Sequence, residues 1–126
     1  MTKKVIVAGV GMIPFKKPGA SENYNVMGEK AARAALEDAG LDYKLVQQAY
    51  VGYVYGDSTA GQAALYGVGL SGIPIFNVNN YCSTGSSALF LARQAVQSGT
   101  IDCAIALGFE QMTPGALDIL FEDRPN

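Results

Sequence analysis

The chain has 126 residues, of which 49% are hydrophobic and 16% charged, and nine basic against eleven acidic side chains give a net charge of −2. This composition excludes a disordered tail, which needs low hydrophobicity and high charge, and it provides no basic surface for nucleic acid or an anionic membrane. No apolar run approaches the roughly 20 residues of a membrane span, and the length is that of one domain or a part of one.

Strand-like and helix-like patterns alternate along the chain. Short β-branched or apolar runs predict strands, and apolar residues at helical spacing predict helices. The predicted strands cover residues 3–11, 49–55, 75–78 and 101–108, and the predicted helices cover residues 25–39, 60–69 and 83–98. This βαβαβαβ order predicts an α/β fold with a mostly parallel sheet and right-handed crossovers.

The helix predicted after the third strand, residues 83–98, is apolar around almost its whole circumference, and only Arg93, Gln94 and Gln97 are strongly polar. Such a helix is typical of a large core or of a contact with a partner. The sequence therefore indicates either a glycine-rich α/β domain or a part of a larger or oligomeric protein. In the second case the chain alone should expose apolar surface and aggregate or oligomerise.

The chemistry open to the chain is limited by its polar residues. The sequence contains no histidine and two cysteines, which excludes histidine-ligated metals and Ser-His-Asp or Cys-His pairs made within the chain. Two cysteines are too few for a disulfide scaffold, and their spacing is not that of metal ligands. We therefore expect neither a metal site nor a bound cofactor, and no cofactor-binding residue is predicted.

Cys82 lies where the third strand meets the start of the apolar helix. In an open α/β sheet, ligands bind beyond the carboxyl ends of the strands, and a helix N-terminus favours thiolate over thiol. Cys82 is therefore predicted to be a nucleophile, and backbone N–H groups near it could stabilise an oxyanion. The alternative is a buried small hydrophobic residue, which is the commoner role of a free cysteine.

Three further positions have less specific patterns. Cys103 lies inside the last predicted strand and is interpreted as a core residue. The Gly9–Gly11 pair resembles the opening of a dinucleotide-binding loop, but the third glycine is missing and Pro14 follows, so a nucleotide site is not predicted. Glu110 ends the last strand and is either a carboxylate that caps backbone N–H groups or a catalytic group.

Five segments together resemble a known family. They are GVGMIPF at 9–15, KPGA at 17–20, VGYVYGDST at 51–59, GIPIFNVNNYCSTGSSALFLARQ at 72–94 and ALGFEQM at 106–112. The chain resembles the N-terminal part of the thiolase domain of sterol carrier protein 2/x, within the thiolase superfamily. The Asn-x-x-Cys-x-(Ser/Thr)-Gly core is shared widely in that superfamily, and the Gly-Asp-Ser-Thr and Gly-Phe-Glu-x-Met segments are typical of the sterol carrier branch.

The resemblance implies an acyltransferase that cleaves 3-ketoacyl-CoA in fatty-acid or sterol side-chain breakdown, with Cys82 as the acylated nucleophile and coenzyme A as co-substrate. It also implies a homodimer, formed here through residues 75–80. Thiolases consist of two similar α/β halves, so residues 1–126 correspond to a partial N-terminal domain. The family's base residues come from later sequence, and the isolated chain is expected to be inactive.

Two other functions are compatible with the residues. One is a non-catalytic, thiolase-like interaction subunit. The other is an aldolase or condensing relative, although the presence of Cys82 favours acyl transfer. The resemblance places the protein in the peroxisome if it is eukaryotic and in the cytoplasm otherwise.

Overall fold

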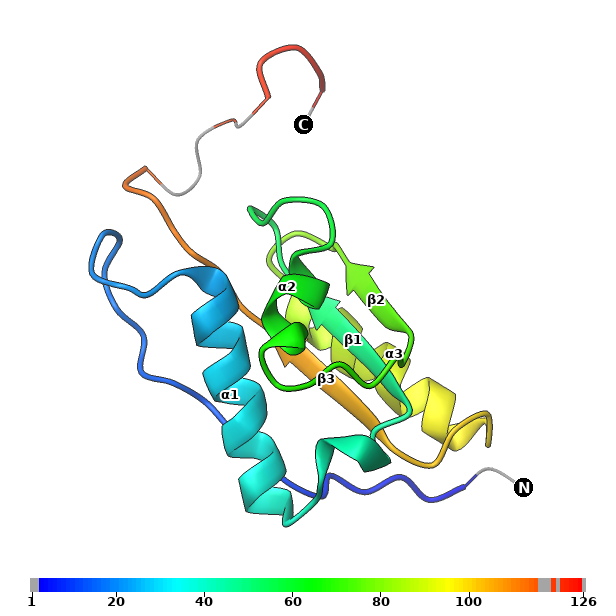
Figure 1. Cartoon of the computed structure of the whole chain (residues 1–126). Coiled ribbons are helices and arrows are strands. Elements are labelled where there is room, and N and C mark those ends of the chain that lie inside the picture. The colour runs from blue at the N-terminus through cyan, green and yellow to red at the C-terminus, as the bar shows by residue number, and fades with distance from the viewer. Residues whose placement is uncertain (1–2, 116–118, 120, 126) are drawn as a thin grey trace.

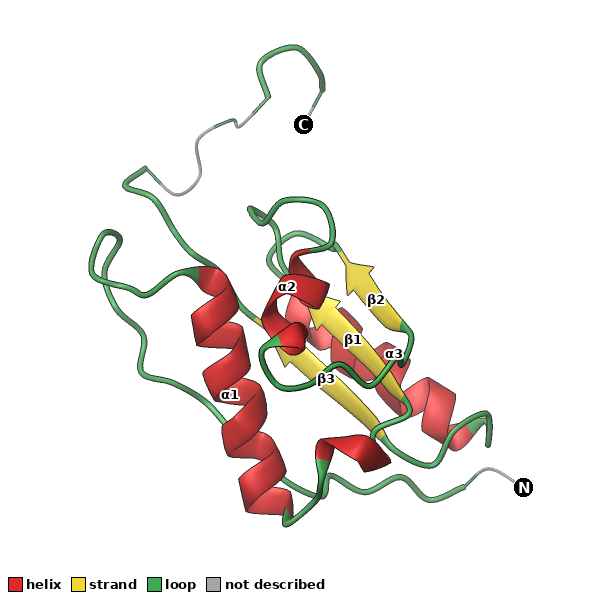
Figure 2. Cartoon of the chain, in the orientation of Figure 1, coloured by secondary structure: helices red, strands yellow, loops and turns green. Residues whose placement is uncertain are grey.

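The computed structural model describes residues 3–115, 119 and 121–125. The elements in chain order are α1 (Tyr24–Ala39), a 3-10 turn η1 (Tyr43–Leu45), β1 (Gln48–Gly52), α2 (Ala60–Tyr66), β2 (Ile75–Val78), α3 (Thr84–Gln97) and β3 (Ala104–Gly108). Figure 2 shows that these helices and strands form one layered unit, with long loops at both ends of the chain. None of the helices in the described part of the chain has the length and apolarity that a membrane crossing requires.

The sheet consists of three parallel strands in the order β2-β1-β3. Gly52, the last residue of β1, pairs with Val78 of β2 on one side and with Gly108 of β3 on the other. The carboxyl ends of all three strands therefore lie at one edge, towards which the arrowheads point in Figure 1. This edge is where the fold class places ligands.

Helices cover both faces of the sheet (Figure 1). Because side chains alternate along a strand, Ala49 and Val51 of β1 point to one face and pack in a core with Leu65 of α2. Tyr50 points to the other face and packs against Ala88 of α3. The predicted α/β class with a parallel sheet is confirmed.

The segment predicted as the first strand, residues 3–11, is not a strand in the structure. It runs as an extended chain beside α1, and Ile6 and Val7 are each 72% exposed. A side chain on Gly9 would lie 2.6 Å from the carbonyl oxygen of Ala35, so the backbone itself approaches the helix. The apolar pattern of the segment is correct for a strand, but a strand also needs a neighbour for its backbone, and no described strand pairs with this one.

The burial of α3 also differs from the prediction. The helix forms where the sequence places it, within one residue at each end, but only the stripe with Thr84, Ala88 and Ala92 is buried. Leu89 and Phe90 on its other side are exposed. The apolar circumference of the helix predicted that α3 would be buried on all sides. Within the described residues, the sheet buries only one side of it.

Candidate active site

Cys82 lies in the turn between β2 and α3, beyond the carboxyl end of its strand, and its side chain is exposed. β2 ends at Val78 and α3 begins at Thr84, so the thiol lies within one turn of the start of a fourteen-residue helix. The structure therefore places Cys82 at the sheet edge and helix N-terminus that the sequence predicts. The exposed thiol excludes the alternative of a buried core cysteine.

The residue before the cysteine has an unusual backbone. Tyr81 has a φ of 53°, in the left-handed region that costs a non-glycine residue roughly 1–2 kcal/mol. The Asn79 side-chain oxygen accepts a hydrogen bond from the Tyr81 N–H at 3.1 Å, and the Ser83 hydroxyl donates to the Asn80 carbonyl at 2.8 Å. Side chains on both sides of Cys82 thus hold the turn in this conformation.

Thr84 contributes the third side chain of this turn. Its hydroxyl accepts a hydrogen bond from the Asn80 N–H at 2.8 Å and donates one to the Tyr81 carbonyl at 2.5 Å. The residue is buried at the junction of α3 with the sheet. In the sequence, Thr84 is marked only by its place in the Asn-x-x-Cys-x-(Ser/Thr)-Gly pattern, two residues after Cys82.

A cavity of about 260 Å³ opens beside Cys82. The ends of β1 and β3, the loops that follow them and the start of α3 form its walls. The lining residues are Gly52, Tyr53, Val54, Tyr55, Tyr81, Cys82, Thr84, Gly85, Gly108, Phe109, Glu110 and Met112. Phe109 is stacked between two tyrosine rings, with centroids 5.4 Å from Tyr53 and 5.2 Å from Tyr24, which makes this wall aromatic and rigid.

Glu110 has a definite position in this cavity. Its carboxylate accepts hydrogen bonds from the backbone N–H groups of Val54 at 2.8 Å and Tyr55 at 3.1 Å. Val54 follows β1 and Glu110 follows β3, so the carboxylate joins the loops of two adjacent strands. Of the two interpretations that the sequence leaves open, the geometry favours the cap of backbone N–H groups.

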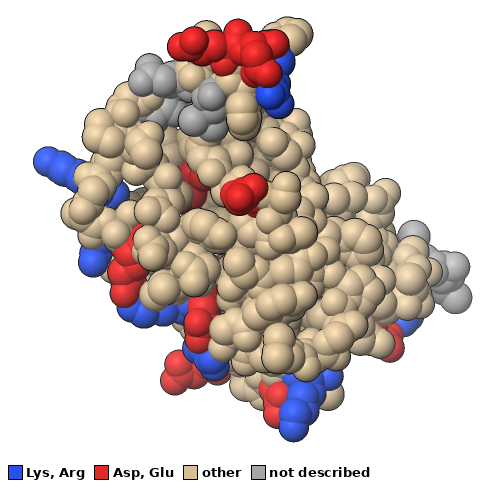
Figure 3. Space-filling view, turned by 45° about the horizontal axis from the view of Figure 1, so that its top comes forward, with Lys and Arg blue, Asp and Glu red and all other residues tan. Residues whose placement is uncertain are grey.

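A second cavity, of about 390 Å³, adjoins the first and shares Gly108, Phe109, Glu110 and Met112 with it. Its other wall consists of the loop 11–21 and part of α1, with apolar side chains such as Met27. Figure 3 brings this end of the molecule forward and shows a broad uncharged area with charged side chains mainly around its margin. Such a surface suits an apolar group better than an ionic one.

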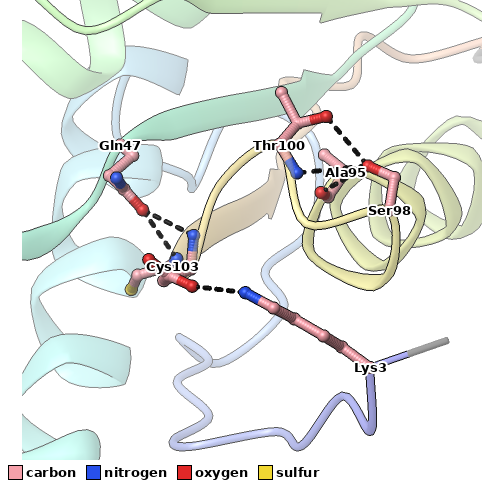
Figure 4. Close-up of polar contacts among 7 residues, drawn as sticks. Lys3, Gln47, Ala95, Ser98, Thr100 and Cys103 are labelled. Carbon is pink, nitrogen blue, oxygen red and sulfur yellow. Dashed lines mark hydrogen bonds and ion pairs between the residues drawn. The ribbon is translucent and has the colours of Figure 1, made fainter. Parts of the chain in front are cut away.

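Cys103 lies at the other end of the sheet, directly before the amino end of β3. It is half-buried against the core, and burial raises the pKa of its thiol above the ordinary value. Its N–H donates to the Gln47 side-chain oxygen at 3.1 Å, and Figure 4 shows Lys3 reaching the same corner of the molecule. Cys103 thus packs against the core as expected, but it precedes β3 and does not lie within the strand, and the parallel strands put it at the edge opposite Cys82.

The site thus combines one exposed thiol, the start of a helix and an aromatic cavity. Within residues 3–115, 119 and 121–125, no three histidine, cysteine or acidic side chains come together in a way that could hold a metal ion. The described groups offer nucleophilic attack by the Cys82 sulfur, whereas the N–H groups of Ser83 and Thr84 are already bonded to the carbonyls of Asn80 and Tyr81.

Sequence comparison with known proteins identifies the thiolase family, which the motifs also resemble. The family model described as "Thiolase, N-terminal domain" matches residues 5–118. The sterol carrier protein 2 of Gallus gallus is 56% identical over 128 aligned positions, covering 100% of this chain and 23% of the relative. The benzoylsuccinyl-CoA thiolase subunit BbsB of Thauera aromatica is 37% identical over 115 positions, covering 90% of this chain and 29% of the relative.

The fold is also shared with solved structures. The acetyl-CoA acetyltransferase of Syntrophomonas wolfei aligns with a TM-score of 0.74 at 23% sequence identity, over 82% of this chain and 28% of that one. The chain spans about a quarter of the length of the curated relatives it matches. On the family match over residues 5–118 and on the identity to sterol carrier protein 2, this chain belongs to the thiolase family.

Proposed function

We propose that this chain carries the nucleophile of an acyltransferase that cleaves 3-ketoacyl-CoA by thiolysis, and that Cys82 is that nucleophile. The observation that supports the proposal most directly is the exposed thiol at the start of α3, beside an aromatic cavity of about 260 Å³. Family membership and the relative named as a benzoylsuccinyl-CoA thiolase subunit support a CoA thioester as the substrate class. Coenzyme A is the co-substrate, and no resident cofactor is proposed.

The proposed reaction has two steps. First, the Cys82 thiolate adds to the keto carbon of the substrate, and the Cα–Cβ bond breaks. The electron pair of that bond goes to the α-carbon, which takes a proton, so that acetyl-CoA or propionyl-CoA leaves and the acyl group stays on sulfur as a thioester. Second, the thiol of free CoA attacks this thioester and releases the shortened acyl-CoA and the thiolate. No residue of this chain is assigned to the proton transfers.

Intact-mass measurement and peptide mapping after incubation with a 3-ketoacyl-CoA test the proposal. In a full-length thiolase that contains this chain, we expect an acyl adduct on Cys82, no adduct in Cys82→Ser, and an unchanged adduct in the matched variant Cys103→Ser. Adduct of equal amount on both cysteines, or its persistence in Cys82→Ser, would contradict the assignment. Parallel assays on this chain and on a full-length thiolase containing it separate an active segment from one that needs further sequence.

We further propose that the chain forms a homodimer through β2 and the residues that follow it, 75–80. β2 is an edge strand of the described sheet, and Phe76 is 45% exposed although its ring is stacked on Tyr50 at 5.1 Å. Leu89 and Phe90 add exposed apolar surface on α3, which packs beneath the same sheet. An unpaired strand edge beside apolar side chains favours pairing with another chain.

Light scattering after size-exclusion chromatography tests the dimer. Phe76→Asp is expected to shift the protein to monomer, because it introduces a charge at the proposed contact. Leu45→Asp, which also changes an exposed apolar residue but lies in η1, is expected to leave the dimer intact. If the chain pairs with other proteins instead of itself, the alternative of a non-catalytic interaction subunit gains support.

The compartment follows from the same proposal. We infer the peroxisome for a eukaryotic source and the cytoplasm for a bacterial one, as for the thiolases that the sequence resembles. A fluorescent fusion of the full-length protein, imaged together with a peroxisomal marker, tests the eukaryotic case.

A further inference from the structure

Thr84 is a polar residue placed in an apolar interior. It is 4% exposed, and its hydroxyl uses both of its hydrogen-bonding functions, as an acceptor for the Asn80 N–H and as a donor to the Tyr81 carbonyl. Burying a hydroxyl without hydrogen-bond partners costs free energy, and these two hydrogen bonds offset that cost for Thr84. The residue is therefore committed to the turn that precedes the helix.

Both bonds fall on the backbone directly before Cys82. The Asn80 N–H and the Tyr81 carbonyl lie on either side of the Tyr81 φ angle, which has the left-handed value of 53°. We propose that Thr84 is a positioning residue for Cys82: its hydroxyl clamps this strained turn and thereby fixes the thiol over the N-terminus of α3.

The clamp is itself held by the sheet. A Cβ atom on Gly52 would lie 2.5 Å from the Thr84 methyl carbon and 2.7 Å from the Thr84 carbonyl oxygen. The backbone of β1 therefore lies close to the methyl group and the carbonyl oxygen of Thr84, with no space for a side chain at position 52. Through this contact, the packed sheet helps to fix the position of the Cys82 sulfur.

The inference deepens the proposed function and rests on it, because Cys82 is taken as the nucleophile. Reaction with a bound substrate is sensitive to placement, and an error of about 1 Å can reduce a rate roughly a hundredfold. A hydroxyl two residues away can therefore affect the reaction strongly without touching the substrate.

Three variants in a Cys103→Ser background, where Cys82 is the single cysteine, isolate the hydroxyl. Thr84→Val removes it and keeps the shape, and Thr84→Ser keeps it and removes the methyl group. Thr100→Val is the matched control, since Thr100 is exposed and lies beyond the far end of α3.

Two rates and one exchange measurement are compared after each variant is shown to be folded at the assay temperature. The first rate is acylation of Cys82 by a 3-ketoacyl-CoA, which depends on placement. The second is alkylation by iodoacetamide at fixed pH, which depends on the exposure and orientation of the thiol and needs no acyl-CoA. Hydrogen exchange of the Asn80 amide reports the hydrogen bond itself.

We expect Thr84→Val to lower the acylation rate by about ten- to a hundredfold and the alkylation rate, through the changed presentation of the thiol, by about two- to fivefold, with faster exchange at Asn80. Thr84→Ser and Thr100→Val should keep the parent rates within about a factor of two. Parent-like rates in Thr84→Val overturn the inference, and so does an equal loss in Thr84→Ser, since the hydroxyl would then not be the cause.

A second variant keeps the test open if Thr84→Val does not fold. Gly52→Ala keeps threonine at position 84, but the added methyl group on β1 pushes the Thr84 side chain away from the sheet. This variant should therefore also lower both the acylation rate and the alkylation rate. A folded Gly52→Ala protein with parent-like rates overturns the inference. If Cys82 is acylated neither in this chain nor in a full-length thiolase that contains it, the proposed function fails, and the positioning role is judged by the alkylation and exchange series alone.

Discussion

Leu65 on α2 is the best position for measuring how much the core stabilises the fold. It is 0% exposed and packs against the central strand in the larger core. Leu65→Ala deletes three carbon atoms, worth about 2.4 kcal/mol at roughly 0.8 kcal/mol each. The cavity left behind brings the expected loss in the free energy of unfolding to about 3 kcal/mol, within the roughly 2–5 kcal/mol found for such substitutions.

Urea unfolding followed by circular dichroism measures this loss. With a slope of about 2 kcal/mol per molar urea, the midpoint should fall by roughly 1.5 M while the slope stays unchanged. The same substitution at Leu70, which is 81% exposed, is the matched control and should change stability by no more than about 0.5 kcal/mol. Equal effects at Leu65 and Leu70, or a loss below about 1 kcal/mol at Leu65, would refute the proposed packing of α2 on the sheet.

Three further outcomes are expected. Burial raises the pKa of the Cys103 thiol, so its thiolate forms only at higher pH, and alkylation near neutral pH should label the exposed Cys82 first. Peptide mapping measures the labelling, and equal labelling of both cysteines in the folded protein would contradict the structure. Glu110→Ala removes the acceptor of two backbone N–H groups, so hydrogen exchange at residues 54–55 should accelerate while exchange in the middle of the sheet stays constant. Gly40 ends α1 with a φ of 63°, so Gly40→Ala should destabilise the fold by about 1 kcal/mol in thermal unfolding, and an unchanged melting temperature would show that the left-handed cap is absent in solution.

The sequence predicts most of the secondary structure because local patterns determine it. Helical spacing of apolar residues locates α1 and α3 to within one residue at each end, and the run 75–78 coincides with β2. Gly40 directly follows the predicted helix 25–39 and ends α1 in the left-handed conformation, which glycine adopts most readily. The failure at residues 3–11 has a different origin, because a strand exists only through its pairing with another strand, which no local pattern contains.

The candidate site is predictable to a similar degree. The junction of strand and helix locates Cys82 at the carboxyl edge, because that edge follows from the order of elements alone. The sequence does not reveal that Glu110 binds the loop after β1, since these residues lie 55 and 56 positions apart. The role of the Thr84 hydroxyl is also hidden, because it depends on a left-handed Tyr81 that no residue preference indicates.

The separation of the two cysteines along the parallel sheet has a practical consequence for handling the protein. Cys82 follows the carboxyl end of β2 and Cys103 precedes the amino end of β3, a strand of five residues that spans roughly 16 Å. A disulfide needs α-carbons closer than about 7 Å, so the native fold cannot join them within one molecule. An intramolecular Cys82–Cys103 bridge on a non-reducing gel is therefore a chemical record of unfolding, whereas oxidation of intact molecules should yield dimers linked through Cys82.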